Sequence, residues 1–304
     1  MFKNKIVTMH LKCNESTFSN YPDLISRDGH KYLEKQGFRH YIICAIPRIN
    51  FTSYDPVREE VHVNIQKDAN NFIAKIIKIK AGAIVLNEKT GEGFATKIRK
   101  IEQTIYPEIK VILDNGYCQL FANTYEFLCH VLEVGNDILF HKIIYIGQTK
   151  VTGKYLRLEK HEKVGKIAEN YLSSKPDVLL AIKLLKFEKP EIMVLKDEEI
   201  NGEAEKMIGK MTPNQITNLI EAALINAYKP TFNKHFKNNF PSTKHRHYNF
   251  IYKKIVDTVS LEVNENLRSY SLNLSGYVSN QQLFCWSLIG NPRADFKDVF
   301  ITNK

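Results

Sequence analysis

Short apolar runs and alternating segments dominate the first 120 residues and predict a strand-rich region. Each run ends at polar or turn-forming residues, which is typical of strands. The segment Tyr21–Gln36 has the spacing of a helix instead. The strands expected here are Tyr41–Ile46, Val61–Ile65, Phe72–Ile79 and Ile109–Leu113.

The pattern changes near residue 125. The apolar runs Tyr125–Val134 and Lys142–Gln148 flank Gly135-Asn136-Asp137 and predict a β-hairpin. A helix is expected at about Tyr155–Tyr171 and a third strand at Val178–Leu185. Together these elements predict a small module in which a three-stranded antiparallel sheet is flanked by helices.

The most strongly predicted helix is Pro213–Tyr228. Thr212 and Gln215 form a capping box before it, and proline suits the first helical position. Apolar residues then recur at helical spacing, and Pro230 ends the helix. Glu221 lies about 120° from the centre of this apolar stripe, so it can reach a cleft at the rim of the core.

The chain therefore reads as an α+β protein of three regions. Residues 1–120 form a strand-rich part suited to substrate recognition or partner binding, residues 121–245 form the small module, and residues 246–304 form a β-rich extension. In the extension, apolar residues alternate with polar ones in two runs, which suggests a hairpin packed on the N-terminal half. The first run contains Val259, Leu261 and Val263, and the second contains Tyr270, Leu272 and Leu274.

The composition is that of an ordinary soluble protein, with 43 % hydrophobic and 25 % charged residues. No apolar run approaches the roughly 18 residues that a membrane span needs, so no membrane partner is expected. The five cysteines are widely spaced, without a Cys-x-x-Cys pair, and no secretory leader is apparent. This usage favours reduced thiols and a cytoplasmic location.

The net charge of +10 is concentrated in two segments. Residues 141–166 carry +5 and residues 229–254 carry +7, whereas the other 252 residues sum to −2. Such a distribution indicates a surface that faces a polyanion. The candidates for nucleic-acid contact are Lys150, Lys154, Lys237, Lys244 and Arg246, the last three interleaved with aromatic residues.

Four residues near these segments supply the groups that phosphodiester hydrolysis needs. A carboxylate (Glu221) can bind a divalent cation, and a guanidinium (Arg157) can stabilise the extra charge of the transition state. Tyr145 or His161 can take a proton from water. Arg157 and His161 are four residues apart on the expected helix, so both project from one face.

The order of these motifs resembles the GIY-YIG nucleases. Ile144-Tyr145-Ile146-Gly147 resembles the second signature strand, and Arg157 with His161 resembles the Arg-x-x-x-His helix that follows it. Glu221 and the run Lys229-Pro230-Thr231-Phe232-Asn233 complete the likeness, with a spacing close to that of the restriction-endonuclease branch. The resemblance covers about residues 125–240.

The resemblance implies a role for each of these residues. Tyr145 would activate or position the attacking water, Arg157 would bind the scissile phosphate, and His161 would assist proton transfer. Glu221 would be the single protein ligand of Mg²⁺ or Mn²⁺, and Asn233 would organise the site without binding the metal. The first signature tyrosine is missing, and His130 lies nearest its expected place, either as a proton acceptor or as an ordinary strand residue.

These features and the resemblance predict an endonuclease that cuts DNA, most naturally double-stranded, in restriction or genome defence. The resemblance implies products with 5′-phosphate and 3′-hydroxyl ends. A catalytically inactive nucleic-acid-binding protein of the same fold, an RNA-directed nuclease and a homing or mobile-element nuclease remain alternatives. Since one active site cuts one strand at a time, double-strand cleavage would need a homo-oligomer or sequential nicking.

Overall fold

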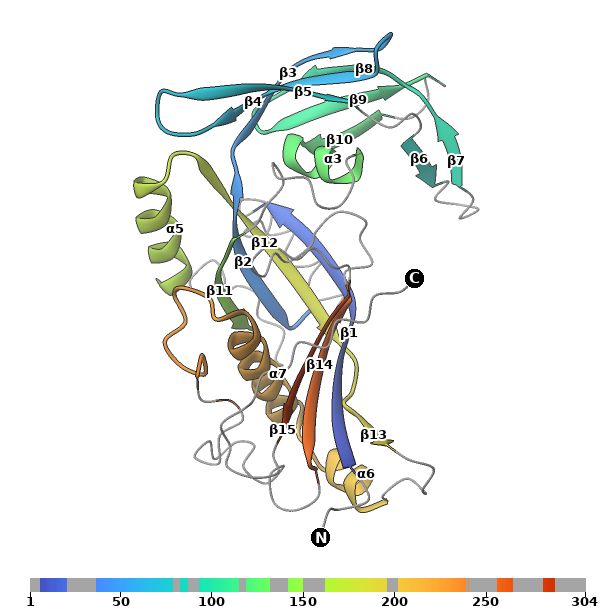
Figure 1. The fold of residues 1–304 in the computed structure, drawn as a ribbon, viewed down its shortest axis with the longest axis vertical. Helices are drawn as coiled ribbons and strands as arrows, with labels where there is room; N and C mark the ends of the chain where they lie inside the picture. The colour runs from blue at the N-terminus through green and yellow to red at the C-terminus, as the bar shows by residue number, and fades with distance from the viewer. Residues whose placement is uncertain are drawn as a thin grey trace.

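The computed structural model describes residues 6–20, 37–78, 83–86, 93–114, 119–131, 142–149, 162–195, 202–238, 240, 256–264 and 281–287. Over these residues the chain is α+β, as the sequence pattern predicts. It contains one seven-stranded mixed sheet, three small antiparallel sheets and helices packed beside them (Figure 1). None of the helices in these ranges is long and apolar enough to cross a membrane.

The large sheet combines strands from every part of the chain. All its pairings are antiparallel except that of β1 with β14, which is parallel. β13 (Glu191–Leu195) pairs with the beginning of β1. Across the sheet the order is β11 (Lys142–Gln148), β2 (His40–Pro47), β12 (Val178–Phe187), β1 (Ile6–Asn20), β14 (Thr258–Asn264) and β15 (Gln281–Ser287).

Helices cover both faces of the sheet around β2 and β12. α5 (Glu162–Ser174) packs into the same hydrophobic cluster as Ile182. α7 (Pro213–Tyr228) packs into the cluster that contains the neighbouring Ala181, whose side chain points to the opposite face. Because both faces are buried, these strands are nearly continuous apolar runs without polar alternation.

The chain between β2 and β11 forms the smaller sheets, which lie together at one end of the large sheet (Figure 1). Helix α3 (Thr124–Val131) packs against β10 and β3 of this part. α6 (Gly202–Gly209) lies elsewhere, against β13. The three small sheets are β3 (Ile49–Asp55), β4 (Glu60–Gln66) and β5 (Phe72–Lys78); β6 (Ala83–Leu86) and β7 (Gly93–Thr96); and β8 (Ile98–Gln103), β9 (Glu108–Leu113) and β10 (Gln119–Asn123).

Most predicted elements are confirmed. Helix α7 has the predicted bounds and capping box. The first strand of the predicted C-terminal hairpin is β14, which packs on β1, but β14 pairs with β15, and the predicted second strand Tyr270–Leu274 lies outside the described residues. α5 confirms the later part of the helix predicted at Tyr155–Tyr171 and continues to Ser174. The predicted helix Tyr21–Gln36 lies outside the described residues. The strands predicted at Tyr41–Ile46, Val61–Ile65, Phe72–Ile79, Ile109–Leu113 and Val178–Leu185 correspond to β2, β4, β5, β9 and β12.

The predicted hairpin between Tyr125–Val134 and Lys142–Gln148 is wrong. Residues Thr124–Val131 form helix α3, and β11 pairs with β2, about 100 residues earlier in the chain. A short apolar run fits a buried helix as well as a strand, so its periodicity did not distinguish them. His130 consequently belongs to a helix and not to a strand beside Tyr145.

The expected boundary at residue 120 does not divide the large sheet. β1 and β2 precede that boundary, yet they pair with β12 and β11 from the region 121–245. The region 49–131 is instead inserted between two hydrogen-bonded strands of the sheet. The candidate site therefore depends on residues from both sides of the predicted boundary.

Candidate active site

Two tyrosines lie side by side on β2 and β11. The ring centroids of Tyr41 and Tyr145 are 6.1 Å apart, with the ring planes tilted by 42°. Gly147 pairs with Tyr41 across the strands, and a Cβ atom at this glycine would overlap the tyrosine ring and hydroxyl. The glycine of the Tyr-Ile-Gly run is therefore needed to make room for Tyr41.

Helix α7 carries Glu221 to the same end of β11. The capping box fixes the start of the helix, because the Thr212 N–H donates to Gln215 Oε1 over 2.8 Å and the Gln215 N–H donates to Thr212 Oγ1 over 3.3 Å. The helix buries the residues on either side of Glu221, while Glu221 itself is only half-buried. Its carboxylate therefore lies at the rim of the core, as its position on the helix predicts.

The side chain of Gln148 orients this carboxylate. Gln148 follows Gly147 on β11, and its Nε2 donates to Glu221 Oε2 over 2.9 Å and to Asn218 Oδ1 over 2.6 Å. An amide donor satisfies part of the carboxylate without adding a charge. Gln148 thus joins the end of β11 to α7 and fixes one oxygen of Glu221.

The loop after α7 is tied to β11. The Ile146 N–H donates to Asn233 Oδ1, and Asn233 Nδ2 donates back to Ile146 O, both over 2.8 Å. The Phe232 N–H also donates to Ile144 O over 2.9 Å. Asn233 is buried, and these bonds use its amide to hold the loop against β11.

A second set of bonds fixes the far end of this loop. Asn226 Nδ2 donates to Phe236 O over 3.0 Å and to Lys237 O over 2.9 Å. Asn226 Oδ1 in turn accepts from Trp286 Nε1 over 2.8 Å. Because Trp286 belongs to β15, the C-terminal hairpin supports the loop through a single asparagine.

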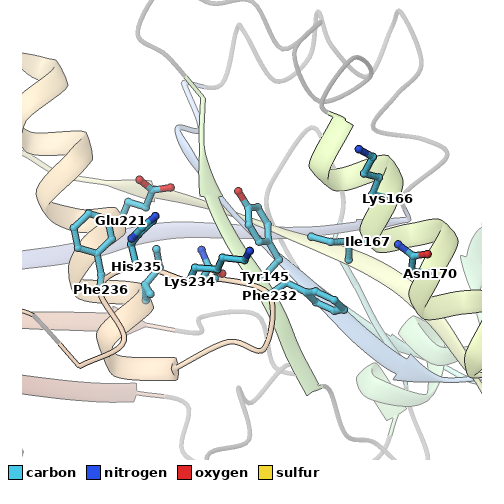
Figure 2. Close-up of a pocket in the computed structure, with 11 residues that line it drawn as sticks. Tyr145, Lys166, Ile167, Asn170, Glu221, Phe232, Lys234, His235 and Phe236 are labelled. Carbon is cyan, nitrogen blue, oxygen red and sulfur yellow. The ribbon is translucent and has the colours of Figure 1, made fainter.

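These elements enclose a pocket of about 480 Å³ (Figure 2). The Tyr145 hydroxyl and the Glu221 carboxylate point toward the same side of it in Figure 2. Lys166 and Lys234 contribute one cation from each basic segment. The full lining is Tyr145, Lys166, Ile167, Asn170, Glu221, Ile225, Phe232, Asn233, Lys234, His235 and Phe236.

Glu221 is the one carboxylate among these lining residues. Within the described ranges no group of three His, Cys, Asp or Glu side chains is placed to hold a metal. Mg²⁺ commonly uses one or two carboxylates and takes its other ligands from water and substrate phosphate. The donor set fits Mg²⁺ or Mn²⁺ held by Glu221 in this way.

A buried histidine on β2, His40, links the strands beside the site to helix α7. His40 pairs with Gln148 across the strands, and its Nε2 lies 3.0 Å from Thr217 O on α7, to which it donates as the neutral tautomer. Burial lowers the pKa of His40 to about 4; the hydrogen bond to Thr217 opposes this effect and the charge of Arg39 adds to it. His40 therefore stays neutral and ties β2 to α7.

The pocket brings together three of the predicted site residues, Tyr145, Glu221 and Asn233. His130 is not among the described residues that line the pocket, and Lys237 instead donates from Nζ to Thr231 O over 3.1 Å. The predicted residues that lie outside the described part of the chain are Arg157, His161, Lys150, Lys154, Lys244 and Arg246.

Sequence reasoning missed Tyr41, Gln148 and His235 at this site. Tyr41 carries no local motif, and only its pairing with Gly147 reveals it. The other two are adjacent or close to recognised motif residues, which is the one signal that pointed to them. Comparisons with protein-family models, curated proteins and solved structures find no match for this chain.

Proposed function

We propose that this protein is a metal-dependent endonuclease that hydrolyses DNA phosphodiester bonds. The observation that carries the proposal is the convergence of Tyr145, Glu221 and Asn233 on one pocket. A phenol, a carboxylate and the nearby cations Lys166 and Lys234 are groups that can handle water, a metal ion and a phosphate.

The proposal includes a GIY-YIG-like module, for which the arrangement of strands offers support. β11, β2 and β12 are adjacent and antiparallel, with α5 and α7 on opposite faces. Tyr41 lies on the strand paired with the Tyr145 strand, so we assign it, in place of His130, to the first signature tyrosine. In this assignment the module is assembled around the insertion 49–131.

The chain's own residues would divide the chemistry as follows. Tyr145 orients the attacking water, whose oxygen bonds to phosphorus while the bond from phosphorus to the 3′ oxygen breaks. Arg157 binds the scissile phosphate, and His161 assists the transfer of protons to give 5′-phosphate and 3′-hydroxyl ends. Glu221 would hold Mg²⁺ or Mn²⁺, which supplies the Lewis acid that offsets the developing charge.

We place this activity in restriction or another form of genome defence in the cytoplasm. The insertion offers a separate surface for recognising DNA, since a small catalytic module has little room to read bases. Cys285 is a free thiol, which supports a reducing compartment.

The decisive experiment is incubation of plasmid DNA with the protein and Mg²⁺, with EDTA as the metal-free comparison. Glu221→Gln should reduce the cleavage rate at least 1000-fold, because one carboxylate is the proposed metal ligand. Glu188→Gln, at an exposed glutamate after β12, is the matched control and should cleave normally. Both variants should have the unfolding midpoint of the wild type within a few degrees.

Cleavage that persists in Glu221→Gln or in EDTA would contradict the assignment of the metal ligand. Binding of plasmid without cleavage by the wild type under any divalent metal would instead favour a non-catalytic nucleic-acid-binding protein. Parallel incubation with structured RNA separates DNA from RNA as the substrate.

A further inference from the structure

The pocket is larger and more apolar than a phosphate and a metal ion require. Besides the polar groups, its walls include Ile167, Ile225, Phe232 and Phe236. Phe232 is 36 % exposed, although phenylalanine is ordinarily among the more buried residues. These side chains offer no hydrogen bond to water or phosphate, so their presence points to contact with an apolar, flat part of a ligand.

Phe232 is held in place as an aromatic wall. Its ring packs edge-on against Tyr171, with centroids 6.0 Å apart and an angle of 78° between the planes. The Phe232 N–H donates to Ile144 O on β11. The next residue, Asn233, makes two hydrogen bonds with Ile146 on the same strand. A ring fixed in this way can stack on a planar ligand with little loss of conformational freedom.

The loop that carries this ring is bounded by two left-handed residues. Lys229 at the end of α7 has φ 46° and Phe236 has φ 69°, a conformation that non-glycine residues rarely adopt. The side-chain amide of Asn226 holds Phe236 in this conformation, because its Nδ2 donates to the carbonyl oxygens of Phe236 and Lys237. Such backbone strain persists where the surroundings enforce it, and it is frequent at ligand sites.

We infer that this pocket binds one nucleobase of the cleaved DNA strand, unstacked from its neighbours, against the ring of Phe232. The inference rests on the proposed function, because it places the base beside the phosphate held near Tyr145 and Glu221. The flat apolar ring of a base matches the aromatic wall, and Asn170 and His235 at the pocket offer hydrogen-bonding groups for its edge. Lys166 and Lys234 complement the charge of the adjoining backbone.

This arrangement defines the class of substrate. A base inside a continuous duplex is stacked on both sides and cannot also stack on Phe232. The preferred DNA therefore has an unpaired or easily unpaired nucleotide next to the scissile phosphate, as in a mismatch, a flap or a single strand, or the enzyme extrudes that nucleotide from the duplex.

The test measures DNA binding without cleavage, using Glu221→Gln protein in EDTA and fluorescein-labelled duplexes. A single abasic site is moved through the duplex one position at a time, and affinity is measured by fluorescence anisotropy. One position should lose about tenfold in affinity, as expected for one lost base–aromatic stack. A mismatch at that position should tighten binding, because less pairing is broken.

The double variant with Phe232→Ala decides whether Phe232 is the partner of that base. In the Glu221→Gln/Phe232→Ala protein, the loss of affinity caused by the abasic site should fall below twofold, whereas Phe232→Trp in place of Phe232→Ala should restore the tenfold loss. Phe72→Ala, at an exposed phenylalanine on β5, is the matched control and should leave the tenfold penalty unchanged. Thermal unfolding checks that the loop variants remain folded.

A uniform abasic profile, or a penalty that persists with Phe232→Ala, would overturn the base-binding inference even if the wild type cuts plasmid. If the loss of affinity depends on the position of the abasic site but the wild type does not cut DNA, base binding is supported and the proposed hydrolysis is refuted. The two proposals can therefore fail separately.

Discussion

His40 shows how a single buried side chain makes the stability of this protein depend on pH. Its pKa is about 4 in the folded chain and near 6.5 when unfolded, so the unfolded chain binds a proton that the folded chain excludes. The neutral ring therefore contributes stability that is fully present above about pH 6.5. That contribution is lost as the pH falls toward 4.

We expect the free energy of unfolding to fall by about 2 kcal/mol between pH 7.5 and pH 5 because of His40 alone. Urea unfolding of His40→Gln should lack this part of the decrease, since glutamine does not titrate. An identical pH slope in His40→Gln and the wild type would show that His40 does not titrate as its burial implies.

Individual residues of the candidate site were predictable to different extents. Tyr145, Glu221 and Asn233 lie within recognisable local motifs, and the structure brings them to one pocket. Tyr41 was not predictable, because its place beside Tyr145 depends on strand pairing across 100 residues. The strand predicted for His130 is wrong for the same reason: the local pattern places the partner of β11 just before it in the sequence, whereas that partner is β2 and His130 lies in α3.

At the scale of elements, the pairing of β11 with β2 requires a glycine at position 147, where the backbone of β11 approaches the Tyr41 ring closely. Gly147→Ala should destabilise the protein by about 1–3 kcal/mol, because the added methyl group overlaps Tyr41 and must displace a buried ring. Cleavage should fall as well, since Tyr145 lies two residues away on the same strand. Urea unfolding and plasmid cleavage measure the two effects.

Gly165→Ala provides the matched control for this prediction. Gly165 is exposed on α5, and a Cβ atom there meets nothing within 4 Å. Alanine should raise stability by about 0.5–1 kcal/mol through its higher helix propensity. Equal stability of Gly147→Ala and the wild type would mean that Tyr41 can move without loss.

Elements were predictable where local signals agreed. Helix α7 has a capping box, a proline at its start and a clear apolar stripe, and its bounds match the prediction. Helix α3 has only a short apolar run without periodic polar breaks, and such a run predicts a strand as readily as a helix. The buried strands β2 and β12 were predictable as strands, but their partners were not.

At the scale of the whole molecule, one sheet unites the two ends of the chain with its middle. β1 is its hub: it pairs with β12 and β13 on one side and with β14 of the C-terminal hairpin on the other. Local sequence patterns specify strands, whereas pairing between distant strands is decided by the packing of the complete core. This is why the local pattern predicts three consecutive regions, whereas the large sheet contains strands from all three of them.

The C-terminal hairpin also reaches the candidate site, which gives a prediction about long-range support. Trp286 is fully buried against Phe240 and donates its indole N–H to Asn226, which holds Phe236 and Lys237 of the site loop. Trp286→Phe keeps an aromatic ring but leaves Asn226 Oδ1 without this donor. The lost bond should lower the free energy of unfolding by about 1–3 kcal/mol.

Comparison with Phe284→Leu separates loop support from general core packing. Phe284 stacks beside Trp286, with centroids 6.3 Å apart, so this substitution also removes volume from the cluster while leaving the Trp286 indole in place. Both variants should lose stability in urea, but only Trp286→Phe should reduce kcat/KM for DNA cleavage, by about tenfold, because only it releases Asn226. If the two variants lose activity in proportion to stability alone, the hairpin acts on the site solely through the core, and the path through Asn226 is refuted.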